Sequence, residues 1–268
     1  MPRRPKLGQH FLRDPRVCRK IADSLRVRSE DLLIEIGPGR GVMTHLLAQR
    51  CRKLVAIEVD PVLAASLRRE FHGDARVEIL EQDVLRVGFC DLCDRHRARE
   101  CYVFGSLPYY ITSPILHHVL GARRNVRHAT VLVQREVAQR LTAAPGSRAY
   151  GYLSVFVQCF TRPEILFEIP PGAFSPPPKV RSALVDMPIS SHFPEWDDAL
   201  SAEFLRFAQL SFALKRKTLL NNLAPSFPRL RIEAALEPLG LGGRARAEQI
   251  SLEELAELFQ SLRGGSFA

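Results

Sequence analysis

Short apolar runs alternate with helix-like segments over the first part of the chain. Four runs consist almost entirely of apolar side chains, which is typical of strands buried on both faces. They span residues 32–36, 54–58, 77–80 and 102–104. Residues 42–50 and 61–71 have helical spacing, and Pro61 suits a first helical turn because its missing N–H is not needed there. This alternation predicts a parallel sheet with helices on both faces.

The pattern changes towards the end of the chain. Residues 130–133 are another apolar run, a helical segment continues through Arg140, and strand-like runs follow to about Met187. Beyond Pro194 only helical spacing remains. Its apolar positions include Phe204, Phe207, Ala208 and Phe212, and then Leu252, Leu255 and Leu258. We therefore predict two domains, an α/β domain over residues 1–190 and a small all-helical domain over residues 191–268.

The charge balance points to a polyanionic partner. The chain of 268 residues has 38 Lys and Arg against 29 Asp and Glu, a net charge of +9. Such a basic balance favours nucleic acid, although a solvated basic surface is the alternative. No apolar run approaches the roughly 18 residues of a membrane span, and no hydrophobic signal segment follows the basic start. We expect a cytoplasmic protein without a membrane partner.

Six cysteines without a signal segment favour reduced thiols over disulfides. Cys90, Cys93, His96 and Cys101 lie close enough in the sequence to suggest a zinc knuckle. However, Cys101 opens an apolar run that we predict to be a strand, which limits how it could fold back. We expect no metal site.

A glycine-rich loop follows the first predicted strand. Gly37, Gly39 and Gly41 allow a sharp turn and close approach to a ligand, but such a loop alone is weak evidence. Glu58 ends the next strand about 20 residues later, where a carboxylate can accept hydrogen bonds from ribose hydroxyls. Asp83 follows the third strand, where it could accept a hydrogen bond from an adenine amino group. Together they favour a nucleoside-bearing cofactor, although solvated acids at strand ends are the alternative.

Ser106-Leu107-Pro108-Tyr109 follows the fourth predicted strand. This segment resembles the Asn-Leu-Pro-Tyr motif of enzymes that methylate the amino group of adenine. That nitrogen is a poor nucleophile because its lone pair is delocalised into the ring. Acceptors aimed at its hydrogens, one a side chain and one a backbone carbonyl, restore the lone pair, and an aromatic ring can stack on the extruded base.

Longer segments resemble the KsgA family of ribosomal RNA adenine dimethyltransferases. They span residues 8–12, 134–141, 145–147, 150–155, 170–180 and 215–219. The resemblance implies a Rossmann-like S-adenosylmethionine-dependent methyltransferase domain followed by a helical domain. It also implies the substrate, two adjacent adenosines in the 3′-terminal hairpin of small-subunit (16S) ribosomal RNA. Each adenosine receives two methyl groups on N6 in an assembling ribosomal subunit, and we expect the enzyme to be a monomer.

The matching motif positions also imply site residues. The residues implied to contact S-adenosylmethionine are Gln9, His10, Leu12, Gly37, Gly39, Glu58, Asp83 and Ser106. The implied catalytic residues are Ser106, Leu107, Pro108, Tyr109 and Phe174. Tyr109 and Phe174 would face the flipped adenine, although packing is an equal alternative for Phe174.

One position departs from the family pattern. Ser106 stands where the family has asparagine, and a serine oxygen reaches less far and is less fixed in orientation. We expect activity to be retained because the rest of the motif is present.

Six basic residues are candidates for RNA contact through phosphate neutralisation. Lys215, Arg216 and Lys217 are predicted to lie on a helix, and Arg135, Arg140 and Arg148 flank loops near the active face. For any single arginine, a solvated surface role is the alternative.

Three other functions fit part of the pattern. An Erm-type enzyme would use the same chemistry on one adenine of large-subunit RNA, but residues 215–218 and the proline-rich loop favour the KsgA family. A non-catalytic ribosome-assembly factor with this fold is suggested by Ser106. A nicotinamide-dependent oxidoreductase is suggested by the glycine loop alone and lacks a set of residues for hydride transfer.

Overall fold

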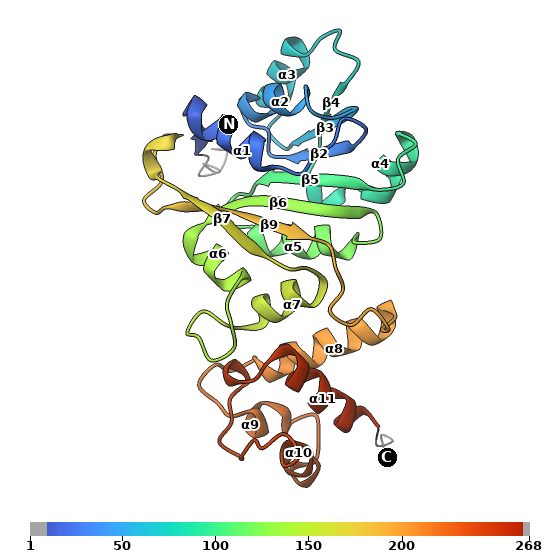
Figure 1. The fold of residues 1–268 in the computed structure, drawn as a ribbon, viewed down its shortest axis with the longest axis vertical. Helices are drawn as coiled ribbons and strands as arrows, with labels where there is room; N and C mark the ends of the chain where they lie inside the picture. The colour runs from blue at the N-terminus through green and yellow to red at the C-terminus, as the bar shows by residue number, and fades with distance from the viewer. Residues whose placement is uncertain (1–9, 265–268) are drawn as a thin grey trace, which may run out of the picture. The chain divides into compact units, whose positions relative to one another are not determined.

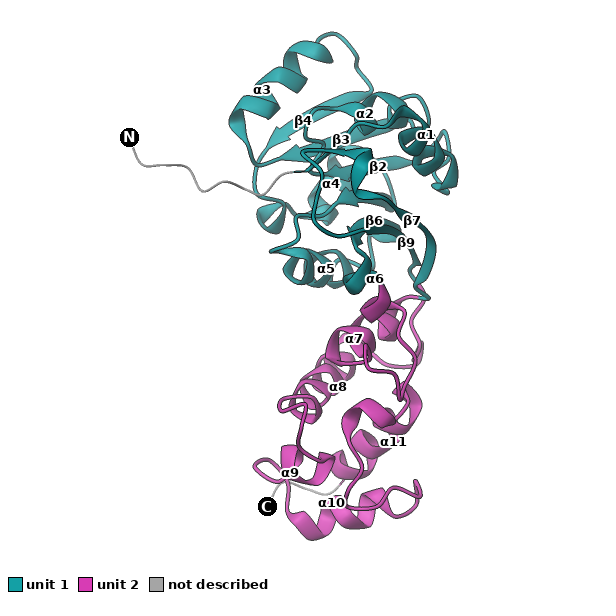
Figure 2. Cartoon of the chain, turned by 90° about the vertical axis from the view of Figure 1, so that its left-hand side faces the viewer, with its two compact units in different colours: residues 1–138, 162–189 teal, residues 139–161, 190–268 magenta. Residues whose placement is uncertain are grey.

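A computed structural model describes residues 10–264 of the chain (Figure 1). The chain forms two compact units, one of residues 1–138 and 162–189 and the other of residues 139–161 and 190–268 (Figure 2). The chain passes between the units three times, and the last passage, at residues 189–190, lies one residue from the predicted boundary at 190–191. Residues 139–161, however, belong to the second unit rather than to the first domain. They contain the apolar helix α7 (Tyr152–Phe160), which packs against helices of the second unit.

The first unit contains a seven-stranded sheet with the order β4-β3-β2-β5-β6-β9-β7. The first five strands in this order are parallel, which confirms the predicted parallel sheet. They are β4 (Val77–Glu81), β3 (Lys53–Glu58), β2 (Leu32–Ile36), β5 (Cys101–Ser106) and β6 (Val126–Gln134). The remaining strands, β9 (Ser182–Pro188) and β7 (Glu164–Ile169), run antiparallel to their neighbours. This reversal was not predicted.

Helices cover both faces of the sheet. Helices α1 (Pro15–Ser24) and α2 (Val42–Leu47) share one apolar cluster with inward side chains such as Leu33 and Phe104. Alternate strand residues point to the other face, where α4 and α5 lie (Figure 2). The other helices of this unit are α3 (Pro61–Glu70), η1 (Val84–Arg86), α4 (Phe89–Arg95), α5 (Thr112–Gly121) and η2 (Pro171–Ala173). Helix α6 (Arg135–Leu141) begins in this unit and ends in the second. Two short strands, β1 (Phe11–Leu12) and β8 (Phe174–Ser175), form a separate antiparallel ribbon.

The second unit is helical, as predicted. Besides α7 it contains α8 (Asp198–Ser211), α9 (Leu219–Leu223), α10 (Arg229–Leu236), η3 (Ala247–Gln249) and α11 (Leu252–Arg263). The rings of Trp196, Phe204, Phe207 and Phe259 pack against one another in its core. Ser251 and Glu254 form a capping box that starts α11. No helix among residues 10–264 is long and apolar enough to cross a membrane.

The helix predicted for Lys215, Arg216 and Lys217 is wrong, because these residues lie in the turn between α8 and α9. Helix α8 ends at Ser211, and the Asn222 amide donates hydrogen bonds to the carbonyls of Ser211 (2.7 Å) and Leu214 (3.3 Å). Thr218 caps the next helix. The three cations are therefore exposed on a turn that side-chain capping stabilises.

A buried carboxyl group lies within the sheet. Glu35 in β2 is 1% exposed, and burial raises its pKa to about 8. The Thr44 side chain opposes this rise, and the negative charge of Glu58 adds to it. In the described part of the chain, Oε2 of Glu35 has no hydrogen-bond partner. The protein therefore favours the neutral acid, and this contribution to stability is lost as the pH rises from about 4.5 to about 8.

We predict that Glu35→Gln, which replaces the neutral acid by a neutral amide, gains stability relative to the parent in alkaline solution. When the pH rises from 5 to 9, the unfolding free energy of the variant should increase relative to that of the parent by about a few kcal/mol. This is the order of magnitude expected from the raised pKa of Glu35. Denaturant unfolding of both proteins at the two pH values measures this shift. A difference that is the same at both values would contradict the prediction.

Candidate active site

A pocket of about 480 Å³ opens at the carboxyl ends of the parallel strands. The strand registers align Ile36, Ile57 and Gly105, so that the loops after β2, β3 and β5 emerge side by side. Ligands of open α/β sheets bind in this location. The volume lies in the range that holds a cofactor of nucleoside size.

The loop after β2 depends on glycine for its conformation. Gly37, Gly39 and Gly41 have φ values of 69°, 59° and 78°, in the left-handed region. A Cβ atom at Gly39 would lie 2.9 Å from the Phe11 ring, and one at Gly37 would lie 3.3 Å from the Ser106 carbonyl oxygen. The glycines thus allow the loop to contact both β1 and the end of β5.

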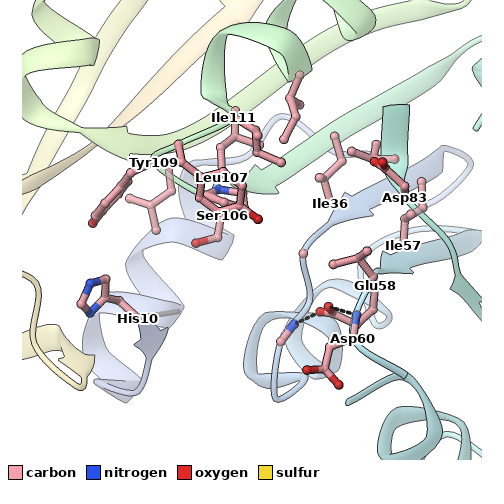
Figure 3. A pocket seen from close by; sticks show the side chains of 18 of the residues that line it. His10, Ile36, Ile57, Glu58, Asp60, Asp83, Ser106, Leu107, Tyr109 and Ile111 are labelled. Atoms are coloured by element: carbon pink, nitrogen blue, oxygen red, sulfur yellow. Dashed lines mark hydrogen bonds between the residues drawn. The ribbon is translucent and has the colours of Figure 1, made fainter. Parts of the chain in front are cut away.

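Glu58 holds this loop in place from the end of β3. Its Oε2 accepts a hydrogen bond from the Gly39 N–H (3.1 Å) and its Oε1 from the Asp60 N–H (2.9 Å), as the dashed lines in Figure 3 show. Glu58 is 3% exposed, and burial raises its pKa while the two N–H donors oppose the rise. Each oxygen retains a further lone pair for a ligand.

Asp83 lies on the pocket wall after β4, as the predicted site requires. Its Oδ1 accepts a hydrogen bond from the Leu85 N–H (3.0 Å) at the start of η1, and no bond to Oδ2 is formed within residues 10–264. Val59 and Leu85 give the same part of the pocket apolar walls. The sequence patterns do not predict these two residues, although Val59 directly follows Glu58 and Leu85 is two residues after Asp83.

The loop that contains Ser106, Leu107 and Pro108 forms the opposite wall. The Leu107 N–H donates to the Leu132 carbonyl (3.0 Å), which anchors the loop to β6. The Pro108 carbonyl accepts from the Thr112 hydroxyl (3.0 Å) and the Ile111 N–H (3.2 Å) at the start of α5. The Leu107 carbonyl accepts no hydrogen bond within residues 10–264. The loop therefore presents the Ser106 side chain and one free carbonyl.

Tyr109 and His10 lie together at one end of the pocket (Figure 3). Their rings stack with centroids 5.9 Å apart, and the Tyr109 hydroxyl is 3.1 Å from the Ser182 hydroxyl. His10 Nδ1 is 2.8 Å from the Pro176 carbonyl oxygen. These contacts orient the Tyr109 ring towards the cavity.

Other predicted residues are placed differently. Leu12 packs against the apolar core and does not line the pocket, whereas Phe11 does, because successive strand residues face opposite sides. Phe174 borders the pocket but is only 2% exposed. Gln9 lies outside the described residues. Tyr110, which is 61% exposed at the pocket rim, had not been predicted.

None of the six predicted RNA-contacting residues lines the pocket. Arg135 is exposed and forms an ion pair with Glu168 (2.9 Å). Within the second unit, the Lys215 ammonium donates a hydrogen bond to the Arg148 carbonyl (3.1 Å). Arg140, Arg216 and Lys217 are exposed there as well.

The cysteine cluster has no arrangement that suits a metal. Cys93 on α4 and Cys101 on β5 are each 1% exposed, whereas Cys90 is exposed and His96 forms an ion pair with Glu78 (3.0 Å). No group of three His, Cys, Asp or Glu side chains within residues 10–264 is placed to hold a metal ion.

The family model of ribosomal RNA adenine dimethylase matches residues 2–263. A protein of Acidobacterium capsulatum named ribosomal RNA small subunit methyltransferase A is 43% identical over 98% of this chain and 92% of its own length. A protein of the same name from Koribacter versatilis is 38% identical over 98% of this chain and 95% of its own length.

Two solved structures extend the comparison. That of the 23S rRNA methyltransferase ErmE has a TM-score of 0.72 at 29% identity, over 94% of this chain and 99% of its own. A dimethyladenosine transferase from Plasmodium falciparum has a TM-score of 0.78 at 22% identity, over 93% and 96%, and it supports the fold. The match of the family model over nearly the whole chain shows that this protein belongs to the ribosomal RNA adenine dimethylase family.

Proposed function

We propose that this protein transfers methyl groups from S-adenosylmethionine to N6 of two adjacent adenosines in the 3′-terminal hairpin of small-subunit ribosomal RNA. The observation that carries the proposal is a single pocket that combines a nucleoside site at Glu58 and Asp83 with the loop from Ser106 to Tyr109. The enzyme would act as a cytoplasmic monomer on an assembling subunit.

The residues on one side of the pocket fit S-adenosylmethionine. Glu58 has lone pairs left for the two ribose hydroxyls, and the free Oδ2 of Asp83 suits the adenine amino group. The glycine loop allows the rest of the cofactor to approach the backbone closely. When bound, the cofactor supplies an electrophilic methyl group on a positively charged sulfur.

The other side of the pocket fits a flipped adenine. The Ser106 hydroxyl and the unpaired Leu107 carbonyl can accept hydrogen bonds from the two N6 hydrogens, which localises the nitrogen lone pair. The Tyr109 ring, held by His10 and Ser182, offers a surface on which the base can stack. Phe174 is too buried to stack fully and would support this wall. The protein then contributes mainly orientation and electrostatics to the transfer.

The second candidate uses the same chemistry on large-subunit RNA, because the similar ErmE structure carries the name 23S rRNA methyltransferase. The higher identity to proteins named small subunit methyltransferase A favours our proposal. Labelled methyl transfer to under-methylated small subunits and to large-subunit RNA, with primer extension to map the product, separates the two. We expect label on adjacent adenines near the 3′ end of the small-subunit RNA. Label on large-subunit RNA alone, or cofactor binding without transfer, would contradict the proposal.

Glu58→Gln should weaken cofactor binding by roughly 10- to 100-fold. The amide nitrogen of glutamine would face the N–H of either Gly39 or Asp60, which removes one hydrogen bond and loosens the loop. Isothermal titration calorimetry with S-adenosylmethionine measures the change. Glu81→Gln is the matched control, because Glu81 ends the neighbouring strand β4, is exposed and forms an ion pair with Arg68. Equal affinities of the two variants would refute the assigned role of Glu58.

Ser106→Ala should lower kcat about tenfold, the typical effect of one lost hydrogen bond. Ser106→Asn should retain activity, since its amide oxygen is also an acceptor. Single-turnover methylation at saturating cofactor measures the chemical step, and cofactor titration of each variant reports separately on binding. A Ser106→Ala variant that methylates RNA at the parent rate would show that the hydroxyl has no acceptor role.

A further inference from the structure

Three exposed arginines surround the start of α1, and we call them the α1 arginine cluster: Arg13, Arg16 and Arg19. They line a shallow hollow on the surface of the first unit together with Asp14, Pro15 and Gly172, so that one carboxylate faces the hollow beside the three guanidinium groups. Arg16 and Arg19 are three residues apart on α1 and therefore share a helix face. Arg19 Nε donates to the Pro15 carbonyl (3.3 Å), so its guanidinium turns back towards the hollow.

The cluster has no acidic partner within the described residues. Many arginines of the same unit do have one, since Arg68 pairs with Glu81 and Arg76 with Asp74. The nearest carboxylate in sequence is Asp14, and its Oδ1 accepts the N–H groups of residues 16 and 17 at the helix cap. The three guanidinium groups therefore form no ion pair within residues 10–264, and with Asp14 counted the hollow keeps a net positive charge for an anionic ligand.

Helix stability does not explain this placement. Cations are favourable near the carboxyl end of a helix and unfavourable near its amino end. The first turn of α1 has no acidic residue, and the cap residue Asp14 supplies one carboxylate there against the three arginines. Asp14 offsets part of the positive charge, and a bound anion would offset the rest.

The cluster adjoins the pocket through the β1–β8 ribbon. The pocket is lined by Phe11 and Phe174 of this ribbon and by His10, which directly precedes β1. Arg13 directly follows β1, and its N–H donates a hydrogen bond to the carbonyl of Ala173, the residue before β8 (2.8 Å). His10 and Arg13 are three residues apart, which is a span of at most roughly 10 Å. A further exposed cation, Arg40, lies over the Phe11 ring at 4.7 Å.

We propose that the α1 arginine cluster binds the phosphodiester backbone of the RNA strand that carries the target adenosines. This inference rests on the proposed function. The cluster would be an RNA contact surface beside the pocket, separate from the six basic residues predicted from the sequence. Phosphates are its chemical match because they are anionic and recur along the strand next to the flipped base.

The test is the salt dependence of RNA binding by the parent and by the variant R13Q/R16Q/R19Q. A fragment of small-subunit RNA that includes the 3′-terminal hairpin is the probe, and fluorescence anisotropy at several salt concentrations gives the slope. The loss of three phosphate contacts should weaken binding roughly tenfold or more at low salt and reduce the slope of log K against log salt by about two to three. Affinity for S-adenosylmethionine should not change.

The matched control is R69Q/R97Q/R99Q, which removes the same charge from exposed positions on α3 and before β5. It should keep a slope near that of the parent. The inference would be overturned if the cluster variant and the parent had equal salt slopes, or if both variants lost the same RNA affinity. It would also be overturned if the parent did not bind the RNA. Weaker binding to whole subunits with unchanged RNA affinity would indicate an acidic protein partner and would also overturn it. A parent that binds RNA through the cluster but transfers no methyl group would refute the proposed function alone.

Discussion

The site depends on the hydrogen bonds that the Glu58 carboxylate accepts from Gly39 and Asp60. A carboxylate that is 3% exposed is costly unless donors surround it, and these two N–H groups provide that compensation. The bonds join the loop after β2 to the end of β3. They hold Gly39 in the left-handed conformation that brings it against Phe11, so that one buried acid positions three separate segments.

Close packing then links the cofactor side of the pocket to the side that we propose for the base. The backbone at Gly37 approaches the Ser106 carbonyl so closely that even a methyl group would be tight. The Ser106 loop is itself anchored to β6 and to the start of α5. A methyl donor on one side and an acceptor nitrogen on the other would therefore meet across a short and rigid gap, as methyl transfer requires.

Much of this arrangement could be predicted from sequence because it follows local rules. Apolar runs gave the parallel strands, and the carboxyl ends of such strands share one edge, which brings Glu58, Asp83 and Ser106 together. The roles of His10 and Tyr109 came from a family resemblance. Their mutual stacking could not be predicted, because it joins residues 99 positions apart in the sequence.

The structure differs from the sequence-based predictions where packing between residues far apart in the chain decides the conformation. The reversal of β9 and β7 leaves no mark on apolar runs, which look alike in either direction. The turn at 215–217 is stabilised by Asn222 of the following helix, whose amide donates to the carbonyl of Ser211 at the end of α8 and to that of Leu214 beyond it. Side-chain alternation in a strand of two residues decides that Phe11 rather than Leu12 faces the pocket. Unpaired surface charge, as in the α1 arginine cluster, is visible only once the acids have been placed.

The proposed methylation of small-subunit RNA is tested most directly by mass spectrometry of its adenosines after incubation of under-methylated subunits with the protein and S-adenosylmethionine. We predict two N6,N6-dimethyladenosines at adjacent positions of the 3′-terminal hairpin, with four cofactor molecules consumed for each RNA. Unmodified adenosines in that hairpin, despite demonstrated cofactor binding, would contradict this prediction.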